Sequence, residues 1–393
     1  MAPLDGRRLW LAGIGGAGMS GYALLAHAWG AEVGGWDRVR TPYLDHLPKG
    51  ISIEIAPEPP KPPRGWEVYV STAFAGRIEG RHRAELLAEL TSLRDSIVVA
   101  GAHGKTTTAS MIAFALREAG ADPAWLVGGE VPQLGANAGA GAGWLVVEGD
   151  ESDRTIASLR PRIAVLTNLD LDHHATFASR AEIEELFADW LEGVPHVVRG
   201  EAVEPYRGEL AVPGEHNRRN AAAALAALDL AGVSRSEAEG ALARFRGARR
   251  RLEHRGEAGG VEVIDDYAHH PAEIAATIAA VRDGGRVLVL FQPHLFSRTR
   301  HLARELAEAL AAADVVALAN VYAAREEPVA GVTGKLVVDA LSELRPGMPI
   351  GWTPEVADGA RFLAARARAG DRVLTLGAGD VDQAVPLLLA ELA

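Results

Sequence analysis

The chain has 393 residues, a length that predicts about two to four domains. Its 52 acidic and 40 basic residues give a net charge of −12, which argues against a protein whose whole surface binds nucleic acid. Cysteine is absent, which excludes disulfides, thiolate zinc sites and cysteine nucleophiles. Because no run of about 18 apolar residues occurs, we expect a cytoplasmic protein without membrane insertion.

Strand and helix patterns alternate along the first part of the chain. We expect strands at 9–14, 31–36 and 67–71, with helices at 19–29 and 82–90. Such alternation is typical of a parallel sheet covered by helices. We place the first α/β domain at residues 1–94.

The same pattern restarts twice, which predicts three α/β domains with parallel sheets and boundaries at 95–247 and 248–393. In the central part the expected strands are 96–100, 144–148 and 163–167, and the expected helices are 107–119, 182–191 and 220–231. In the last part the expected strands are 261–265, 286–291, 315–319 and 372–376. The Ala/Gly-rich stretch 138–143 is predicted to be a loop.

A glycine-rich loop, Gly101-Ala-His-Gly-Lys-Thr-Thr107, follows a predicted strand and precedes a predicted helix. In this setting backbone N–H groups bind phosphate, the lysine contacts the β- and γ-phosphates, and the threonine hydroxyl coordinates Mg²⁺. The loop departs from the usual motif, since Val99 holds the position of the first glycine. We predict a nucleoside triphosphate site, and the alternative is a plain glycine turn before a helix.

A second glycine loop, Gly13-Ile-Gly-Gly-Ala-Gly18, lies between a predicted strand and helix. Asp37 ends the next predicted strand, where a dinucleotide fold contacts a ribose hydroxyl. The motif predicts a phosphate-bearing ligand without saying which one. As a structural alternative, the glycines only allow the helix to pack closely on the strand. As a functional alternative, the loop belongs to a nicotinamide-dependent dehydrogenase.

Acidic residues follow two central strands, in the segments 146–153 and 166–174. The carboxyl ends of parallel strands are where α/β proteins place their sites, so Thr106, Glu148 and His173 are candidate Mg²⁺ ligands beside a triphosphate. Solvated loop charges are the alternative.

Further polar clusters occur in the segments 214–220, 249–251, 265–271 and 292–298. Asparagines of the first segment suit a helix cap or an adenine, and the arginine run suits a phosphate or solvent. The two histidine-bearing loops suit recognition of a carboxylate.

In this order the motifs resemble those of the Mur ligases of peptidoglycan synthesis, over essentially the whole chain. The loops GIGGAGMSG and AGAHGKTTT and the blocks EGDESD, TNLDLDHH, GEHNRRN, DDYAHHP and FQPHLFSRT carry the resemblance. DDYAHHP with FQPH is most similar to the branch that joins L-alanine to UDP-N-acetylmuramate. The resemblance implies a Rossmann-like UDP-sugar domain, a central P-loop ATPase domain and a Rossmann-like amino-acid domain.

The resemblance also implies roles for residues. For ATP it implies Gly101, His103, Gly104, Lys105, Thr106, Thr107, Asn217, Asn220 and Arg250, and for Mg²⁺ it implies Thr106, Glu148 and His173. For the UDP-sugar it implies Gly15, Ala17, Gly18, Met19, Ser20, Asp37, Ser71, Thr72, Glu151 and Asp153. For the amino acid it implies Tyr267, His269, His294 and Arg298, and for catalysis Lys105 and Arg250, with His269 or His270 as the candidate base. The resemblance further implies that the amino acid is joined to the substrate carboxylate through an acyl phosphate intermediate. We also expect the protein to be a monomer or a weak homodimer.

Two departures from the family pattern stand out. Leu295 replaces an arginine that some relatives carry, and the segment 191–212 is short, which predicts a trimmed central domain. The alternatives to the L-alanine ligase are a salvage ligase that adds a tripeptide and a nucleotide-binding homologue with impaired catalysis.

Overall fold

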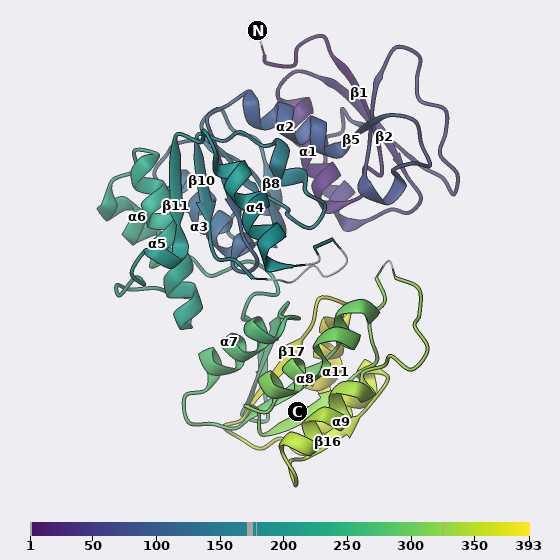
Figure 1. Cartoon of the computed structure of the whole chain (residues 1–393), viewed down its shortest axis with the longest axis vertical. Helices are drawn as coiled ribbons and strands as arrows, with labels where there is room; N and C mark the ends of the chain where they lie inside the picture. The colour runs from purple at the N-terminus through teal and green to yellow at the C-terminus, as the bar shows by residue number, and fades with distance from the viewer. Residues whose placement is uncertain (1, 171–175, 178, 325) are drawn as a thin grey trace. The chain divides into compact units, whose positions relative to one another are not determined.

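The computed structural model describes residues 2–170, 176–177, 179–324 and 326–393. The chain forms two compact units (Figure 1). The first unit comprises residues 1–171, 179–211 and 219–248, and the second comprises residues 172–178, 212–218 and 249–393. Helix α5 (Glu215–Leu230) contributes to both units. The α/β class predicted from the sequence is confirmed, and the described part of the chain forms three separate sheets.

The first sheet of the first unit is parallel and has the order β3-β2-β1-β4-β5. Its core includes the fully buried side chains of Leu11, Trp36 and Tyr69. β1 runs directly into the first glycine loop, as the sequence predicted. The elements are β1 (Arg8–Ala12), α1 (Ala17–Ala28), β2 (Glu32–Asp37), β3 (Ser52–Ile55), β4 (Glu67–Val70), β5 (Arg81–His82) and α2 (Arg83–Ser92).

The second sheet has the order β11-β10-β6-β9-β7-β8, and only β8 runs antiparallel to its neighbour. Strand β6 is buried along its whole length, which fits its place inside the sheet. The elements are β6 (Ser96–Ala100), α3 (Lys105–Glu118), β7 (Ala124–Val131), β8 (Ala136–Gly139), β9 (Leu145–Glu148), β10 (Ile163–Leu166), α4 (Arg180–Leu191), β11 (His196–Arg199) and α6 (Arg235–Leu242).

The prediction of a loop at 138–143 was wrong at its start, because Ala138 and Gly139 belong to β8. A Cβ at Gly139 would overlap the ring of Trp125 on the neighbouring strand β7. Gly139 therefore lets the backbone of β8 approach the Trp125 ring closely. Composition alone does not distinguish a glycine with this role from a glycine in a loop.

The sheet of the second unit has the order β12-β13-β17-β14-β15-β16, parallel except for the β12–β13 pair. Apolar side chains on its faces, such as Phe291 and Leu374, pack against the covering helices. The elements are β12 (Glu253–Ala258), β13 (Val261–Asp266), α7 (Pro271–Val281), β14 (Val287–Phe291), α8 (Phe296–Leu310), β15 (Val315–Leu318), α9 (Lys335–Leu344), β16 (Ile350–Trp352), α10 (Val356–Ala364), β17 (Arg372–Leu376) and α11 (Val385–Leu392).

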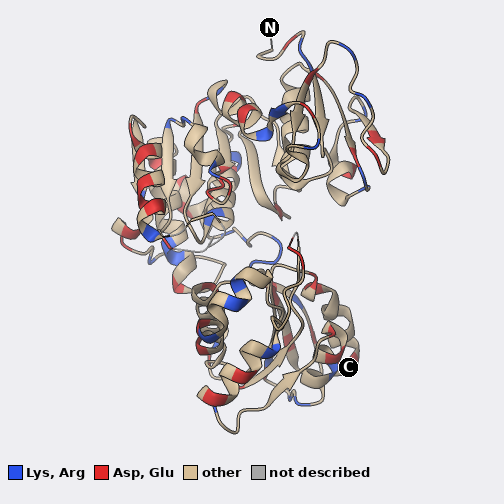
Figure 2. Ribbon diagram, turned by 45° about the vertical axis from the view of Figure 1, so that its right-hand side comes forward, with Lys and Arg blue, Asp and Glu red and all other residues tan. Residues whose placement is uncertain are grey.

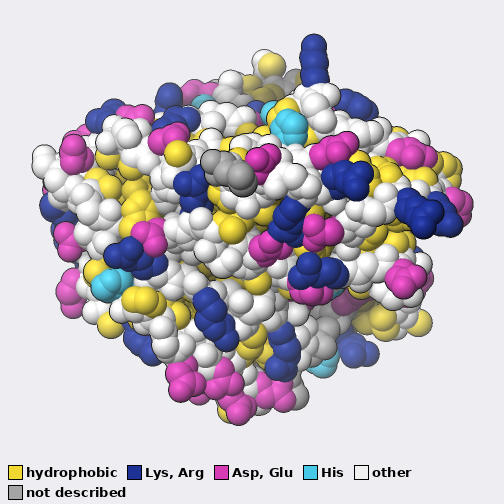
Figure 3. Space-filling view, turned by 90° about the horizontal axis from the view of Figure 1, so that it is seen from above, with side chains coloured by type: hydrophobic (Ala, Val, Ile, Leu, Met, Phe, Trp, Pro, Cys, Tyr) yellow, Lys and Arg dark blue, Asp and Glu magenta, His cyan; other side chains and the backbone are white. Residues whose placement is uncertain are grey.

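Residues of both charges are spread over the helices and loops of both units (Figure 2). On the face that Figure 3 presents, basic and acidic side chains are interspersed. No helix among the described residues is long and apolar enough to cross a membrane.

Candidate active site

The glycine-rich loop of the central sheet connects β6 to α3. Gly101 and Gly104 both adopt positive φ angles, of 127° and 81°. A side chain on Gly101 would collide with Thr167, and one on Gly104 would collide with Asn220. Both positions therefore require glycine, whereas Val99 lies inside β6 and its place in the motif needs no turn.

Asn168 holds the backbone of this loop from the end of the neighbouring strand β10. Its Oδ1 accepts a hydrogen bond from the N–H of His103 at 2.9 Å, and its Nδ2 donates to the carbonyl of His103 at 2.9 Å. The Thr167 hydroxyl donates to the same carbonyl at 2.7 Å. Sequence reasoning grouped this segment with metal ligands and missed its role as a clamp on the loop.

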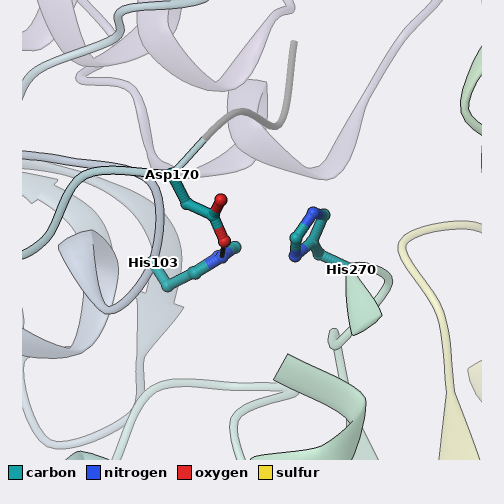
Figure 4. Close-up of side chains that lie close together, drawn as sticks. All are labelled: His103, Asp170 and His270. Atoms are coloured by element: carbon teal, nitrogen blue, oxygen red, sulfur yellow. Dashed lines mark ion pairs between the residues drawn. The ribbon is translucent and has the colours of Figure 1, made fainter. Parts of the chain in front are cut away.

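The His103 side chain points toward the acidic segment after β10. Its Nε2 lies 3.5 Å from Oδ2 of Asp170 (Figure 4). His270, which Figure 4 also labels, belongs to the second unit. His173, predicted as a Mg²⁺ ligand, lies outside the described residues.

Lys105 begins α3 and its ammonium group is enclosed by oxygen atoms. Nζ donates to the carbonyls of Gly101 and Ala102 at 2.7 and 3.2 Å and pairs with Oε1 of Glu151 at 2.9 Å. Burial acts to lower the pKa of Lys105, but the nearby carboxylates, Glu151 first, outweigh it and raise that pKa. The ammonium is therefore a fixed positive charge at the carboxyl end of β6, where an anionic phosphate would bind.

Thr106 in the first turn of α3 lies beside Glu148, which ends β9. The Thr106 hydroxyl donates to Oε1 of Glu148 at 3.0 Å, and the N–H of Gly128 donates to its Oε2 at 2.6 Å. A hydroxyl and a carboxylate are oxygen ligands of the kind that Mg²⁺ prefers. The two predicted ligands that the structure describes thus fit a Mg²⁺ site beside the loop.

The first glycine loop is held by Asp37. Oδ2 of Asp37 accepts a hydrogen bond from the N–H of Gly15 at 2.8 Å, and the Thr41 hydroxyl donates to the carbonyl of Gly15 at 2.6 Å. Asp37 is buried, so one of its oxygens is committed to shaping the loop. The predicted residues Ala17, Gly18, Met19 and Ser20 form the first turn of α1, and Ser71 packs against Gly13.

Arg83, which sequence reasoning missed, joins the predicted UDP-sugar residues Thr72 and Asp153. Its Nε donates to the Thr72 hydroxyl at 2.9 Å, its Nη2 pairs with Asp153, and its Nη1 donates to the hydroxyl of Tyr22 at 3.2 Å. Burial acts to raise the pKa of Asp153, but a hydrogen bond from Thr155 and the charge of Arg83 lower that pKa overall. The only signal available was a basic residue at the start of a helix, which is too common to single out.

Asn217 and Asn220 lie three positions apart on α5. Asn217 Nδ2 donates to the carbonyl of Pro213 at 2.7 Å, which differs from the helix cap weighed from the sequence, because a capping side chain accepts a hydrogen bond from a backbone N–H. Asn220 lies against Gly104 of the phosphate loop. Asn220 belongs to the same unit as the phosphate loop, whereas Asn217 belongs to the second unit. Of the two asparagines, Asn220 is thus the one that the structure places next to the predicted triphosphate site.

In the second unit, Arg250 is engaged by acceptors of its own unit. Its Nε pairs with Asp265 at 2.9 Å, and its Nη1 and Nη2 donate to the carbonyls of Gly379 and Gly377, both at 2.7 Å. Burial raises the pKa of Asp265, and Arg250 partly offsets that effect. These contacts tie the end of β13 to the loop after β17.

The predicted amino-acid residues gather at the carboxyl ends of β13 and β14. The rings of Tyr267 and His269 meet edge to face at 5.5 Å, and those of His269 and His294 at 5.6 Å. Arg298 approaches Nδ1 of His294 at 3.2 Å. Tyr322, which sequence reasoning missed, stacks on His294 at 5.9 Å and extends the cluster from the loop after β15.

Glu273 of α7 fixes the backbone of the two candidate base residues. Its Oε2 accepts hydrogen bonds from the N–H groups of His269 and His270 at 3.2 and 3.3 Å. Nδ1 of His269 lies 2.9 Å from the carbonyl of Tyr267. His270 is buried at the start of α7.

Leu295 lies in the left-handed half of the backbone map, with φ 70° and ψ 134°. Such a conformation is strained for a residue with a side chain. Its N–H donates to the carbonyl of Tyr322 at 2.9 Å, which connects the two loops that carry the His294–Tyr322 stack. The backbone of Leu295 therefore helps to hold the two loops together, while its side chain differs from the arginine that some relatives carry.

Comparison with known proteins agrees with this arrangement. The family profiles "Mur ligase middle domain" and "Mur ligase, glutamate ligase domain" match residues 99–199 and 250–379. The UDP-N-acetylmuramate–L-alanine ligase of Renibacterium salmoninarum is 40% identical over 453 residues, with 98% of this chain and 96% of that protein covered. That of Kineococcus radiotolerans is 41% identical over 457 residues, with 98% and 96% covered.

The crystal structure of the UDP-N-acetylmuramate–alanine ligase of Thermotoga maritima has a TM-score of 0.77 at 25% identity, with 98% of each chain covered. The sequence alignments are longer than the 393 residues of this chain, so these relatives contain segments that it lacks. The alignments with both curated relatives cover 98% of this chain. The chain belongs to the Mur ligase family.

Proposed function

We propose that this protein is an ATP-dependent ligase that joins L-alanine to the carboxylate of UDP-N-acetylmuramate in peptidoglycan precursor synthesis. The observation that carries the proposal is the phosphate loop, in which Lys105 and the Thr106–Glu148 pair lie together at the carboxyl ends of β6 and β9. The relatives at 40–41% identity are named for this reaction.

In the first step the loop binds the triphosphate of ATP. Backbone N–H groups and Lys105 neutralise the phosphate charge. Thr106 and Glu148 would hold a Mg²⁺ ion, which would supply further charge neutralisation at the phosphates. The substrate carboxylate then attacks the γ-phosphate, which forms an acyl phosphate and releases ADP. Phosphoryl transfer depends mainly on positioning and charge neutralisation, so the Asn168 clamp on the loop contributes by holding its N–H groups in place.

In the second step the amino group of L-alanine attacks the acyl carbonyl and expels phosphate. The amine must lose a proton, and the proposed base is His269 or His270, whose backbone N–H groups Glu273 fixes beside the aromatic cluster. His294 and Arg298 are proposed to hold the amino-acid carboxylate, a task for which a guanidinium is well suited.

On the UDP-sugar side we propose the first glycine loop, with Asp37 as its support, together with Thr72, Glu151 and Asp153. The Glu151 carboxylate pairs with Lys105, so this side of the site adjoins the phosphate loop. Arg250 is proposed to serve the γ-phosphate, which requires it to exchange its contacts with Gly377 and Gly379 for the ligand.

The test is phosphate release from ATP and Mg²⁺ with UDP-N-acetylmuramate, in the presence and absence of L-alanine. We expect release that requires both substrates, with UDP-N-acetylmuramoyl-L-alanine as product. A parallel reaction supplies the tripeptide L-Ala-γ-D-Glu-meso-diaminopimelate, and release with the tripeptide alone would contradict the proposal. Absence of release, with intact binding of both nucleotides, would favour a homologue with impaired catalysis.

A K105A variant provides the matched control. We expect it to lose ATP turnover while UDP-sugar binding persists, and normal turnover would contradict the proposed role of the phosphate loop. We further propose a cytoplasmic protein, monomeric or weakly dimeric, whose product serves cell-wall growth and division.

A further inference from the structure

A hollow of about 620 Å³ opens at the edge of the central sheet opposite the phosphate loop. It is lined by residues that precede β6, β10 and β11, which are parallel neighbours, so their starting ends meet at one edge. Strand β6 has five residues, which separates this edge from the glycine loop by about 16 Å. The hollow is therefore distinct from the proposed ATP site.

The hollow has an excess of positive charge in a protein whose net charge is −12. Three guanidinium groups line it, those of Arg94, Arg160 and Arg162, and His196 adds an imidazole. Asp95 is the one carboxylate among the lining residues. It pairs with Arg162 at 2.7 Å, but both side chains are more than half exposed, so this pair neutralises the site weakly.

Two of the arginines are positioned by aromatic rings. The Arg94 guanidinium lies 5.5 Å from the centre of the Trp29 ring, and that of Arg162 lies 5.9 Å from the Trp144 ring. Such contacts orient a guanidinium and leave its N–H groups available. The side chains are therefore partly ordered before any ligand binds.

The N–H groups of these arginines are incompletely used. Within the described residues, only Nη1 of each has a protein acceptor: Ala142 for Arg94, Ala157 and Leu159 for Arg160, and Asp95 for Arg162. Nε of Arg94 is buried and has no hydrogen-bond partner in that part of the chain. A guanidinium carries five N–H donors that match phosphate oxygens, so the hollow offers many donors and few acceptors.

We propose that this hollow binds a small phosphate-bearing polyanion, at a second anion site separate from catalysis. The volume is that of a small-molecule site and exceeds what a single phosphate fills. Three guanidinium groups around one concavity favour a ligand with two or more negative charges. A di- or triphosphate group has the required charge and size.

The experiment titrates the full chain with inorganic tripolyphosphate by calorimetry, in magnesium-free buffer at low ionic strength. The K105A variant weakens the phosphate loop as a competing site, and saturating UDP-N-acetylmuramate occupies the proposed UDP-sugar site. In this background we expect one bound tripolyphosphate per chain. Adding R160Q and R162Q together is expected to weaken this binding at least tenfold. Adding R235Q, which removes an exposed arginine of α6 paired with Glu239, is the matched control and is expected to leave it unchanged.

Melting curves of all variants check that each is folded. A variant with R160K and R162K keeps the charge and loses the forked geometry, so it is expected to bind with intermediate affinity. The proposal is overturned if K105A binds no tripolyphosphate, or if R160Q and R162Q change its affinity no more than R235Q does. Because the readout is binding and not turnover, its failure leaves the proposed ligase activity untouched.

Discussion

Replacing Asn168 with alanine tests whether the clamp on the phosphate loop matters. The change removes two hydrogen bonds, each 2.9 Å long, that hold the N–H and the carbonyl of His103. At about 1 kcal/mol net for each bond, the free energy of unfolding of the first unit should fall by about 2 kcal/mol. For a unit of this size the melting temperature should fall by about 4–8 °C.

The same loss should weaken ATP binding. If the freed loop samples other conformations, ATP must restore the bound one, and a cost of about 2 kcal/mol corresponds to a dissociation constant about thirtyfold higher. The assay is calorimetric titration with a non-hydrolysable ATP analogue and Mg²⁺, together with thermal unfolding. Asn320→Ala is the control, because the Asn320 side chain is exposed and its Oδ1, among the described residues, accepts only from the neighbouring Val321 N–H. An Asn168→Ala variant that melts and binds like the parent chain would refute the reasoning.

Three further predictions concern single side chains. Thr106→Val removes the hydroxyl bonded to Glu148, so turnover should fall at least about a hundredfold and require more Mg²⁺, as a Mg²⁺ titration of phosphate release will measure. Burial raises the pKa of Asp266 to about 6. The protonated carboxyl therefore stabilises the fold fully below about pH 4, and the free energy of unfolding should fall by about 3 kcal/mol as the pH rises through 6. Denaturant titrations at several pH values should find this fall absent in Asp266→Asn. Gly139→Ala should destabilise the first unit by about 1–3 kcal/mol in the same titrations, because the methyl group overlaps Trp125.

Each of these has its own control. Thr106→Ser keeps the hydroxyl and should retain most of the activity, and equal loss in both variants would argue against a role for the hydroxyl. A pH dependence of unfolding that is the same with and without the Asp266 carboxyl would show that its pKa is not raised. Combining Gly139→Ala with Trp125→Leu should recover part of the stability, whereas additive losses would mean that the overlap is not the cause.

The sequence predicted those parts of the fold that depend on local patterns. Strands at 96–100 and 372–376 begin and end where expected, because each is a mainly apolar run that a glycine follows directly. Short strands at the sheet edges, such as β3 and β16, were missed because they carry too few apolar residues to stand out. The order of the strands was not predictable at all, since it depends on contacts distant in sequence.

In the candidate site, too, the features set by local sequence patterns were predictable and those set by distant contacts were not. The phosphate loop was predictable because its glycines and lysine are needed at fixed spacing, and the Thr106–Glu148 pair followed from the rule that parallel strands share their carboxyl ends. The roles of Asn168 and Arg83 were not predictable, because each acts through a hydrogen bond to a partner more than 60 residues away. Such supporting residues have no local signature.

The enclosure of Lys105 in the phosphate loop has a practical consequence for labelling, because the sequence has lysine at only three other positions. Lys49, Lys61 and Lys335 are exposed, while Lys105 is enclosed by the loop carbonyls and Glu151, with its pKa raised. Reagents that acylate amines react with the unprotonated form, so they should modify the three exposed lysines and spare Lys105 near neutral pH. Fluorophores or surface linkers can therefore be attached through lysine without disturbing the nucleotide loop, and a fourth modified lysine in a mass spectrum would report that the loop has opened.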